Sequence, residues 1–221
     1  KQVEYADFTN HDGKGIHITS YSQVGPVIAD DIKSSSYKAL ILSLLVIFIY
    51  ILLRFRKWQY SAGAIIALVH DTLVVLACFS LFHGILPFPM EIDQAFIAAL
   101  LTVIGYSMND TVIVFDRIRD YLSKDSQKSE RELINDAINT TLSRTINTSL
   151  VTLLTIIILF FFGGASIKGF AFALIVGITI GTYSSIFVAT PVIVDFAKSM
   201  RIRTKKTKEA ITNKLSKSKA V

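Results

Sequence analysis

The sequence predicts an α-helical integral membrane protein that crosses a lipid bilayer five times. Of its 221 residues, 52% are hydrophobic, and these gather into long blocks with the charged residues between them. A helix needs about 20 apolar residues to cross a bilayer core, and five blocks approach or exceed that length. Buried helices of a soluble protein are a poor alternative, because one short chain rarely holds five such blocks. The predicted spans are residues 37–53, 60–82, 94–115, 145–162 and 167–196.

Lysine and arginine residues in the loops predict the orientation, since cytoplasmic loops carry an excess of both. If the N-terminal segment is outside, the cytoplasmic segments are 54–59, 116–144 and 197–221, and they hold 18 of the 23 basic residues. We therefore predict an extracytoplasmic N-terminal segment and a cytoplasmic C-terminus. This topology already explains the net charge of +6. Nucleic acid is not an expected partner, because no basic groove with interleaved aromatic residues occurs in a soluble segment.

Residues 1–36 are predicted to be the C-terminal part of an extracytoplasmic α+β domain. Residues 14–21 alternate and contain β-branched side chains, which indicates a strand. Pro26 suits the first turn of a helix, and this helix is expected to run through residues 27–36 into the first span. One strand and one helix do not form a stable domain. We therefore expect the rest of this domain upstream of Lys1.

The cytoplasmic connection before the fourth span contains a predicted amphipathic helix at residues 129–143. Ser129 followed by Glu132 is a capping-box pattern, which indicates a helix start. Five apolar residues then follow at helical spacing, namely Leu133, Ile134, Ala137, Ile138 and Leu142. This stripe fits a helix on the inner membrane interface and a packed helix equally well. The basic tail at residues 197–221 could contact anionic membrane lipids.

Asp110 is the leading candidate for a functional residue, because ionisable groups inside membrane helices are costly and usually functional. About 16 residues of the third predicted span precede it, so it lies in the inner half of the membrane. Tyr106 lies one turn earlier on the same helix face. A carboxyl group that is neutral or charged according to its access to the two sides suits a proton relay. The alternative is a structural carboxylate held by neighbouring hydroxyl groups.

Arg144 opens the fourth predicted span and is the second candidate. Thr148, Thr152 and Thr155 follow it at helical spacing. A polar stripe of this kind is expected to face the helix bundle, where hydroxyl groups can bond across helices. An Asp110–Arg144 pair is therefore feasible, with the carboxyl group as the member that changes charge, because arginine stays charged. The alternative is an arginine that extends to the inner headgroups.

Several other residues are weaker candidates. His70 and Asp71 lie near the middle of the second predicted span, where they fit either a relay or a hydrogen-bonded structural pair. Tyr106 and Thr148 are further relay candidates. Gly177 and Gly181 form a GxxxG pair, which permits close helix packing and specifies no ligand.

Two further features of the sequence, a charged helix end and the lack of enzyme motifs, bear on function. The charged residues Asp116, Arg117, Arg119 and Asp120 are typical of a solvated helix end. No nucleotide-binding loop, metal-ligand cluster or nucleophile triad occurs in the sequence. We therefore predict neither an enzyme nor a cofactor or metal site.

Four segments of the sequence carry a resemblance to a known family. The most specific is GYSMNDTVIVFDRIRD, at residues 105–120. The other three are VGPVIADDI, NTTLSRTINTSLVTLLT and FGGASIKGFAFALIVGITIGTYSSIFVATPVIVD. Together they resemble the SecF family, which is part of the bacterial protein-export machinery. The resemblance covers roughly residues 14–197 and is specific, since it goes beyond shared hydropathy.

The resemblance implies five of the six helices of a resistance-nodulation-division-type half-bundle, preceded by the end of an outer ferredoxin-like domain. It implies a bacterial inner-membrane protein that pairs with SecD or a SecD-like half and assists the SecYEG channel. Proton flow, with no other cofactor, would help to draw unfolded exported polypeptides outward. The family's charged pair falls on Asp110 and Arg144. Because the chain starts inside the outer domain, we expect a fragment or the end of a SecD–SecF fusion.

Three functions compete on this sequence. The first is a proton-driven subunit of protein export, which the resemblance favours. The second is a structural subunit that holds SecD at the channel without conducting protons. The third is a proton-driven exporter of small molecules or lipids on the same helix bundle.

Overall fold

The protein is an α-helical bundle with five long apolar helices, described by a computed structural model over residues 26–123 and 128–195. No strand occurs within these ranges. The predicted strand at residues 14–21, the rest of the predicted outer segment before Pro26 and the basic tail at 197–221 lie outside the described residues. The helix predicted at residues 27–36 is present as the first part of the helix Pro26–Phe55. The chain divides into two units, residues 1–35 and residues 36–221. The contacts below belong to the second unit.

The helices are α1 (Pro26–Phe55), α2 (Trp58–Phe82), α3 (Gln94–Ser123), α4 (Glu130–Phe162) and α5 (Ala165–Ser184). A π-helical segment, η2 (Ser185–Ala189), follows α5 directly, and the helical span continues to Asp195. Each of the five spans is long and apolar enough to cross a membrane. The predicted count of five is therefore confirmed over residues 26–123 and 128–195, and Pro26 begins α1 as its fixed φ favours.

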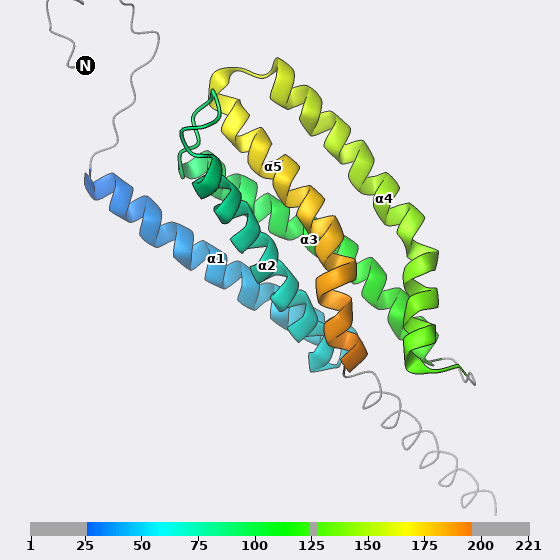
Figure 1. The fold of residues 1–221 in the computed structure, drawn as a ribbon. Helices are drawn as coiled ribbons and strands as arrows, with labels where there is room; N and C mark the ends of the chain where they lie inside the picture. Colours follow the sequence, from blue (N-terminus) through cyan, green and yellow to red (C-terminus); the bar gives the residue numbers. More distant parts are fainter. Residues whose placement is uncertain (1–25, 124–127, 196–221) are drawn as a thin grey trace, which may run out of the picture. The chain divides into compact units, whose positions relative to one another are not determined.

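Helices α3 and α5 form the centre of the bundle, and α2 and α4 flank α5 on opposite sides (Figure 1). Gly177 and Gly181 make this close approach possible. A Cβ atom at Gly181 would lie 2.8 Å from Cβ of Ser107, and one at Gly177 would overlap Val103. The absence of side chains at these two positions lets the backbone of α5 lie directly on α3.

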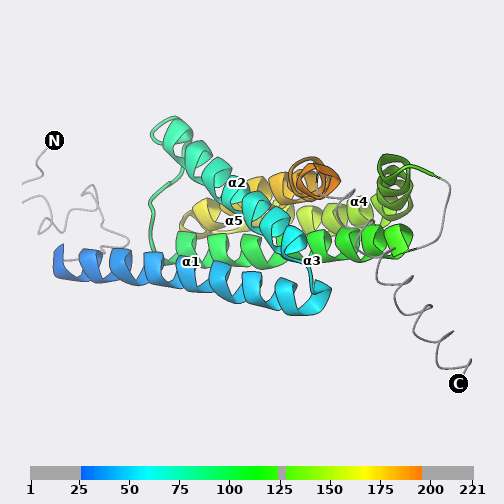
Figure 2. The same ribbon diagram turned by 90° about the horizontal axis from the view of Figure 1, so that it is seen from below.

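Helix α4 is continuous from Glu130 to Phe162, although the sequence predicts an amphipathic helix and a separate span. The capping box at its start is confirmed, since Ser129 and Glu132 bond reciprocally. Figure 2 shows the first turns of α4 bending away from its later part. Near the bend, the hydroxyl groups of Thr140 and Thr141 bond back to the carbonyl oxygen of Ala137, a contact that often bends helices.

The apolar stripe at the start of α4 packs against protein. Leu133, Ile134 and Ala137 are buried, and the last two belong to the main hydrophobic cluster. The packed-helix interpretation is thus the one that the structure supports. Burial against neighbouring helices explains why a single helix can extend beyond the predicted span.

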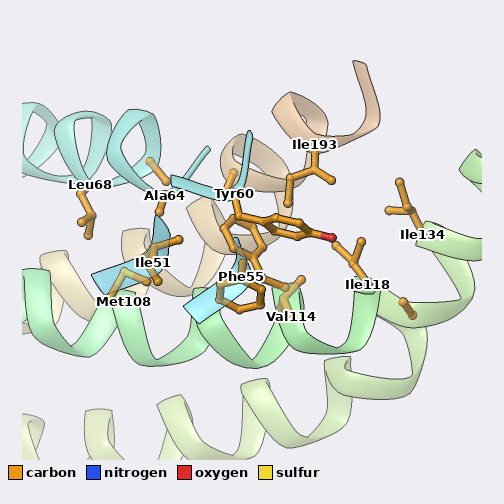
Figure 3. Close-up of a cluster of buried hydrophobic side chains, with 14 of the residues drawn as sticks. Ile51, Phe55, Tyr60, Ala64, Leu68, Met108, Val114, Ile118, Ile134 and Ile193 are labelled. Carbon is orange, nitrogen blue, oxygen red and sulfur yellow. The ribbon is translucent and has the colours of Figure 1, made fainter. Parts of the chain in front are cut away.

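A cluster of aromatic residues joins α1, α2 and α3 at the end predicted to be cytoplasmic. The rings of Phe55 and Tyr60 stack at 4.9 Å, and Phe115 meets Tyr60 edge-on at 5.4 Å. Figure 3 shows Phe55 and Tyr60 side by side, next to Val114 of α3. Large aromatic contacts of this kind hold helix ends together through buried area and ring geometry.

Charged side chains cover this aromatic cluster. Asp116 Oδ1 lies 2.7 Å from Arg119 and 3.3 Å from Arg54. Both guanidinium groups lie about 5.3 to 5.4 Å from the centre of the Phe55 ring, within the range of a cation–π contact. The solvated helix end predicted from the sequence is therefore present, but it does not describe all the contacts of these residues. These residues are partly exposed, and they also tie α3 to α1.

Candidate functional site

Asp110 is fully buried in α3 and has an incomplete set of hydrogen-bond partners. Its Oδ2 accepts a hydrogen bond from the hydroxyl group of Ser149 in α4 at 3.2 Å. Its Oδ1 has no partner among the described residues. A buried polar atom without a partner is costly, so this oxygen is the position at which the site can take up a proton or a charged partner.

A short chain of hydroxyl groups leads from Asp110 to α5. Thr182 Oγ1 donates to Ser149 Oγ at 2.7 Å. The Ser149 hydroxyl has one proton and two acceptors in reach, Asp110 and the carbonyl oxygen of Thr145 at 3.0 Å. It can therefore donate to the carboxylate or turn back to its own helix when Asp110 no longer needs a donor.

Arg144 is close enough to Asp110 for its charge to act on the carboxyl group, but its side chain is exposed. Over residues 26–123 and 128–195 the two side chains form no ion pair. Thr148 and Thr155 are exposed as well, whereas Thr145 and Ser149 are buried. The buried hydroxyl groups of α4 thus lie one residue further along the helix than the predicted stripe. One residue is a rotation of about 100°.

Tyr106 provides another contact between α3 and α4, one turn from Asp110. Its hydroxyl group donates to Thr152 Oγ1 at 3.1 Å, and both side chains are half-buried. Thr152 is the member of the predicted threonine stripe that faces α3. The contact brings the polar side of α4 against the helix that carries Asp110.

Asp71 is a second fully buried carboxyl group, and it has a fuller set of partners. Its Oδ2 accepts from Ser107 of α3 at 2.7 Å and from Ser184 of α5 at 2.8 Å. Its Oδ1 lies 3.1 Å from Nδ1 of the neighbouring His70, whose side chain is partly exposed. The His70–Asp71 pair predicted from the sequence is present.

Sequence reasoning did not select Ser149, Thr182 or Ser184 as partners of the two carboxyl groups. Serine and threonine are common in membrane helices, so their presence alone carries little signal. One feature of the sequence could have selected Ser149. It lies one turn after Thr145 in the fourth predicted span, which Arg144 opens. The helix rotation that selects it is a result of packing.

The side chains around Asp110 and Asp71 offer carboxyl and hydroxyl groups. Among the described residues no group of three or more His, Cys, Asp or Glu side chains comes together. Buried carboxyl groups contacted by hydroxyl groups can bind and release protons.

Comparisons with known proteins agree on one family. Residues 4–199 match the family described as protein export membrane protein SecD/SecF, C-terminal. The protein translocase subunit SecF of Rhodothermus marinus is 59% identical over 172 residues, which are 78% of this chain and 56% of the relative. The protein translocase subunit SecDF of Brucella abortus is 43% identical over 80% of this chain and 23% of its own length.

A solved structure shows the same fold. The crystal structure of SecDF from Thermus thermophilus, a translocon-associated membrane protein, superposes with a TM-score of 0.72 at 40% identity. The match covers 79% of this chain and 23% of that one. The chain spans little more than half the length of the SecF relative and about a quarter of the fused SecDF proteins. The chain belongs to the SecD/SecF family of protein export membrane proteins, and it matches their C-terminal region.

Proposed function

We propose that this chain is part of a membrane subunit that couples proton movement to the export of proteins across the bacterial inner membrane. Its relatives are named protein translocase subunits. A translocase subunit is a transport component rather than a known enzyme. One observation supports the proton coupling: Asp110 is fully buried inside a membrane helix and keeps one carboxyl oxygen without a partner in the described part of the chain. Such an atom is retained where a proton or a charge must come and go.

In this proposal Asp110 binds a proton from one side of the membrane and releases it to the other. When Asp110 is ionised, the hydroxyl group of Ser149 donates to it. When Asp110 is protonated, Ser149 can turn to the carbonyl oxygen of Thr145, which lies 3.0 Å away. The contact between α3 and α4 then loses a hydrogen bond. Repacking of these two helices would move the extracytoplasmic part of the protein.

Arg144 is proposed to supply the positive charge that the ionised form of Asp110 needs. It lies on α4, about one turn before Ser149, on the exposed flank that also carries Thr148 and Thr155. A long arginine side chain can change direction without moving the helix. The exposed and the Asp110-facing positions of Arg144 would then correspond to the two charge states of Asp110.

The proposed partner is SecD or a SecD-like half. The exposed flank of α4 carries Arg144 at the start of the apolar span and then Thr148 and Thr155, with the exposed Val151 between the two threonines. Lipid hydrocarbon is a poor solvent for arginine. A second membrane half would cover this flank, and the fused SecDF relatives have such a half in the same chain by name. Further proposed partners are the SecYEG channel, unfolded exported polypeptides and the surrounding membrane lipids.

The test is replacement of Asp110 by asparagine in the full-length protein. Asp110→Asn keeps the size and the acceptor for Ser149 but removes proton binding. We expect normal assembly with the partner half and loss of proton-dependent export, measured as the release of a secretory protein from energised membrane vesicles. The matched control is Asp93→Asn, which keeps the hydrogen bond that caps α3 and is expected to export normally.

Normal export by Asp110→Asn would contradict proton coupling through this residue. If deletion of the subunit then still stopped export, the structural role would be the better explanation. If neither change affected export but drug or lipid efflux fell, the chain would belong to an exporter of small molecules.

A further inference from the structure

We propose that Asp71 is a positioning residue for Asp110. It holds α3 and α5 in the arrangement where Thr182 donates to Ser149 and the Ser149 hydroxyl group reaches the Asp110 carboxyl group. This inference rests on the proposed proton-binding role of Asp110. It assigns Asp71 a different role from the relay that its sequence also allows.

Asp71 joins three helices at one buried point. It lies on α2 and accepts hydrogen bonds from Ser107 of α3 at 2.7 Å and Ser184 of α5 at 2.8 Å. Apart from His70, the groups that hold it are hydroxyls. With these three contacts both oxygens of Asp71 have partners, whereas Oδ1 of Asp110 has none in the described chain. A carboxylate whose oxygens are all occupied is suited to hold helices in place.

The two serines that bind Asp71 lie next to the residues that serve Asp110. Ser184 is two residues from Thr182 on α5, and Ser107 is three residues from Asp110 on α3. Thr182 donates to Ser149, and Ser149 donates to Asp110. A shift or rotation of α5 against α3 would therefore lengthen the contacts at Asp71 and at Asp110 together.

The change of helical winding at the end of α5 explains why α5 needs a fixed contact at Ser184. The π-helical segment η2 begins at Ser185, directly after Ser184. A π-helical turn is a rare winding that is common at functional sites. Ser185 bonds to Thr111 of α3 at 2.9 Å, so Asp71 and Thr111 hold the two residues at which the winding changes.

The hydrogen bonds argue against a direct relay from Asp71 to Asp110. Within the described residues, the Asp71 contacts end at Ser107 and Ser184, and the Asp110 contacts pass through Ser149 and Thr182. No side-chain hydrogen bond connects these two sets there. They are connected through the backbones of α3 and α5, which transmit position and no protons.

The experiment measures the reactivity of Asp110 in the full-length protein with its partner half, in membrane vesicles. A hydrophobic carbodiimide reacts with protonated carboxyl groups in apolar surroundings, and mass spectrometry locates the product over a range of pH. The variants are Ser184→Ala, Asp71→Asn and the two combined. The control is Ser61→Ala. It removes a fully buried hydroxyl group of α2 that has no partner among the described residues.

We expect Ser184→Ala to increase the labelling of Asp110 about threefold at a pH well above the pH of half-labelling, where only a small fraction of the carboxyl group is protonated. This is the size of effect of one weakened hydrogen bond. The reason is that the Ser149 hydroxyl then stabilises the carboxylate form less well. In the Asp71→Asn background Ser184→Ala is expected to add nothing, because the two residues act as one unit. Ser61→Ala should leave the labelling unchanged.

Wild-type labelling in Ser184→Ala, an equal change in Ser61→Ala, or additive effects in the double variant would each overturn the proposal. If Asp71→Asn does not accumulate in the membrane, the comparison of Ser184→Ala with Ser61→Ala decides. A changed labelling pattern together with normal export by Asp110→Asn would refute the proposed function and leave the positioning role standing.

Discussion

At the scale of single residues, the bundle treats two buried carboxyl groups in opposite ways. Asp71 is contacted on both oxygens, by two serines and a histidine. Asp110 is contacted on one oxygen by one serine. A buried polar atom without a partner is costly. The contacts of Asp71 therefore favour a lasting structural role, and the open oxygen of Asp110 favours the binding and release of a proton. The number of donors around each group, more than its burial, distinguishes the two roles.

Ser149 is the residue on which the Asp110 site depends most directly. We expect Ser149→Ala to lower proton-dependent export about tenfold, because loss of a hydrogen bond to a charged group is worth about 1.5 kcal/mol or more. Export from energised vesicles measures the effect. Ser143→Ala is the control on the same helix, since it removes an exposed serine hydroxyl group that lies two turns before Leu150 and away from the proposed partner surface. Equal losses in the two variants would show that the effect is not specific to Asp110.

At the scale of helices, close packing between α3 and α5 brings the site together. Gly177 lies against Val103 and Gly181 against Ser107, so that the two backbones approach without intervening side chains. The short hydroxyl side chains of Ser107 and Ser184 reach the Asp71 carboxyl group, and that of Thr182 reaches Ser149, only because these backbones are close. The polar site therefore depends on the same close packing of α3 against α5 that the two glycines allow.

This dependence can be tested with a pair of glycine substitutions. Gly177→Ala would bring a methyl group into Val103, and we expect a loss of about 1 to 3 kcal/mol in stability, as for other overpacked cores. Gly105→Ala is the matched control, because a Cβ atom there has no heavy atom within 4 Å. It should be neutral or slightly stabilising, since alanine favours helix. Thermal unfolding in detergent, followed by circular dichroism, distinguishes the two variants.

The start of α4 depends on its capping box. Ser129→Ala removes the acceptor for the backbone N–H of Glu132, and we expect a cost of about 1 kcal/mol. Hydrogen exchange should become faster in the first turns of α4 and remain unchanged beyond the bend. Asn139→Ala, an exposed change on the same helix, should not produce this pattern. Faster exchange along all of α4 would mean that the first turns and the span unfold as one unit.

At the scale of the whole molecule, the most informative surface is the polar flank of α4. Arg144, Thr148 and Thr155 are exposed there, while Leu150 is exposed on the other flank of the same helix. In a membrane, lipid solvates the leucine flank well and the polar flank poorly. The second flank is therefore the expected contact surface for another membrane half.

Single-cysteine crosslinking tests this surface. The chain has one cysteine, Cys78, so Cys78→Ala removes the thiol group of this part of the protein, and any cysteine of the remaining protein and of the partner half is replaced as well. A photoactivated crosslinker attached at Thr148→Cys is expected to capture the SecD half in membranes. The same reagent at Leu150→Cys should capture lipid and little protein, because that position lies about 200° further around the helix. Equal capture at both positions would show that the partner does not select the polar flank.

The sequence by itself determined the membrane class, the number of spans and the family. These properties depend on the length of apolar blocks and on local patterns such as Ser129 with Glu132, which act within one helix and need no neighbour. The sequence also indicated Asp110 and Asp71, because an ionisable residue inside an apolar block is visible without a structure. It predicted Gly177 and Gly181 as packing positions from their spacing alone.

Only the tertiary structure decided which groups meet. It joined the amphipathic helix and the fourth span into α4. It also buried Thr145 and Ser149, and placed Ser149 against Asp110, where the sequence predicted Arg144 and Thr148. It also brought Ser107 and Ser184 to Asp71 from helices 36 and 113 residues away. The physical reason is that a one-residue rotation of a helix costs little in hydropathy but changes every contact on its face. Packing at the glycines selects that rotation.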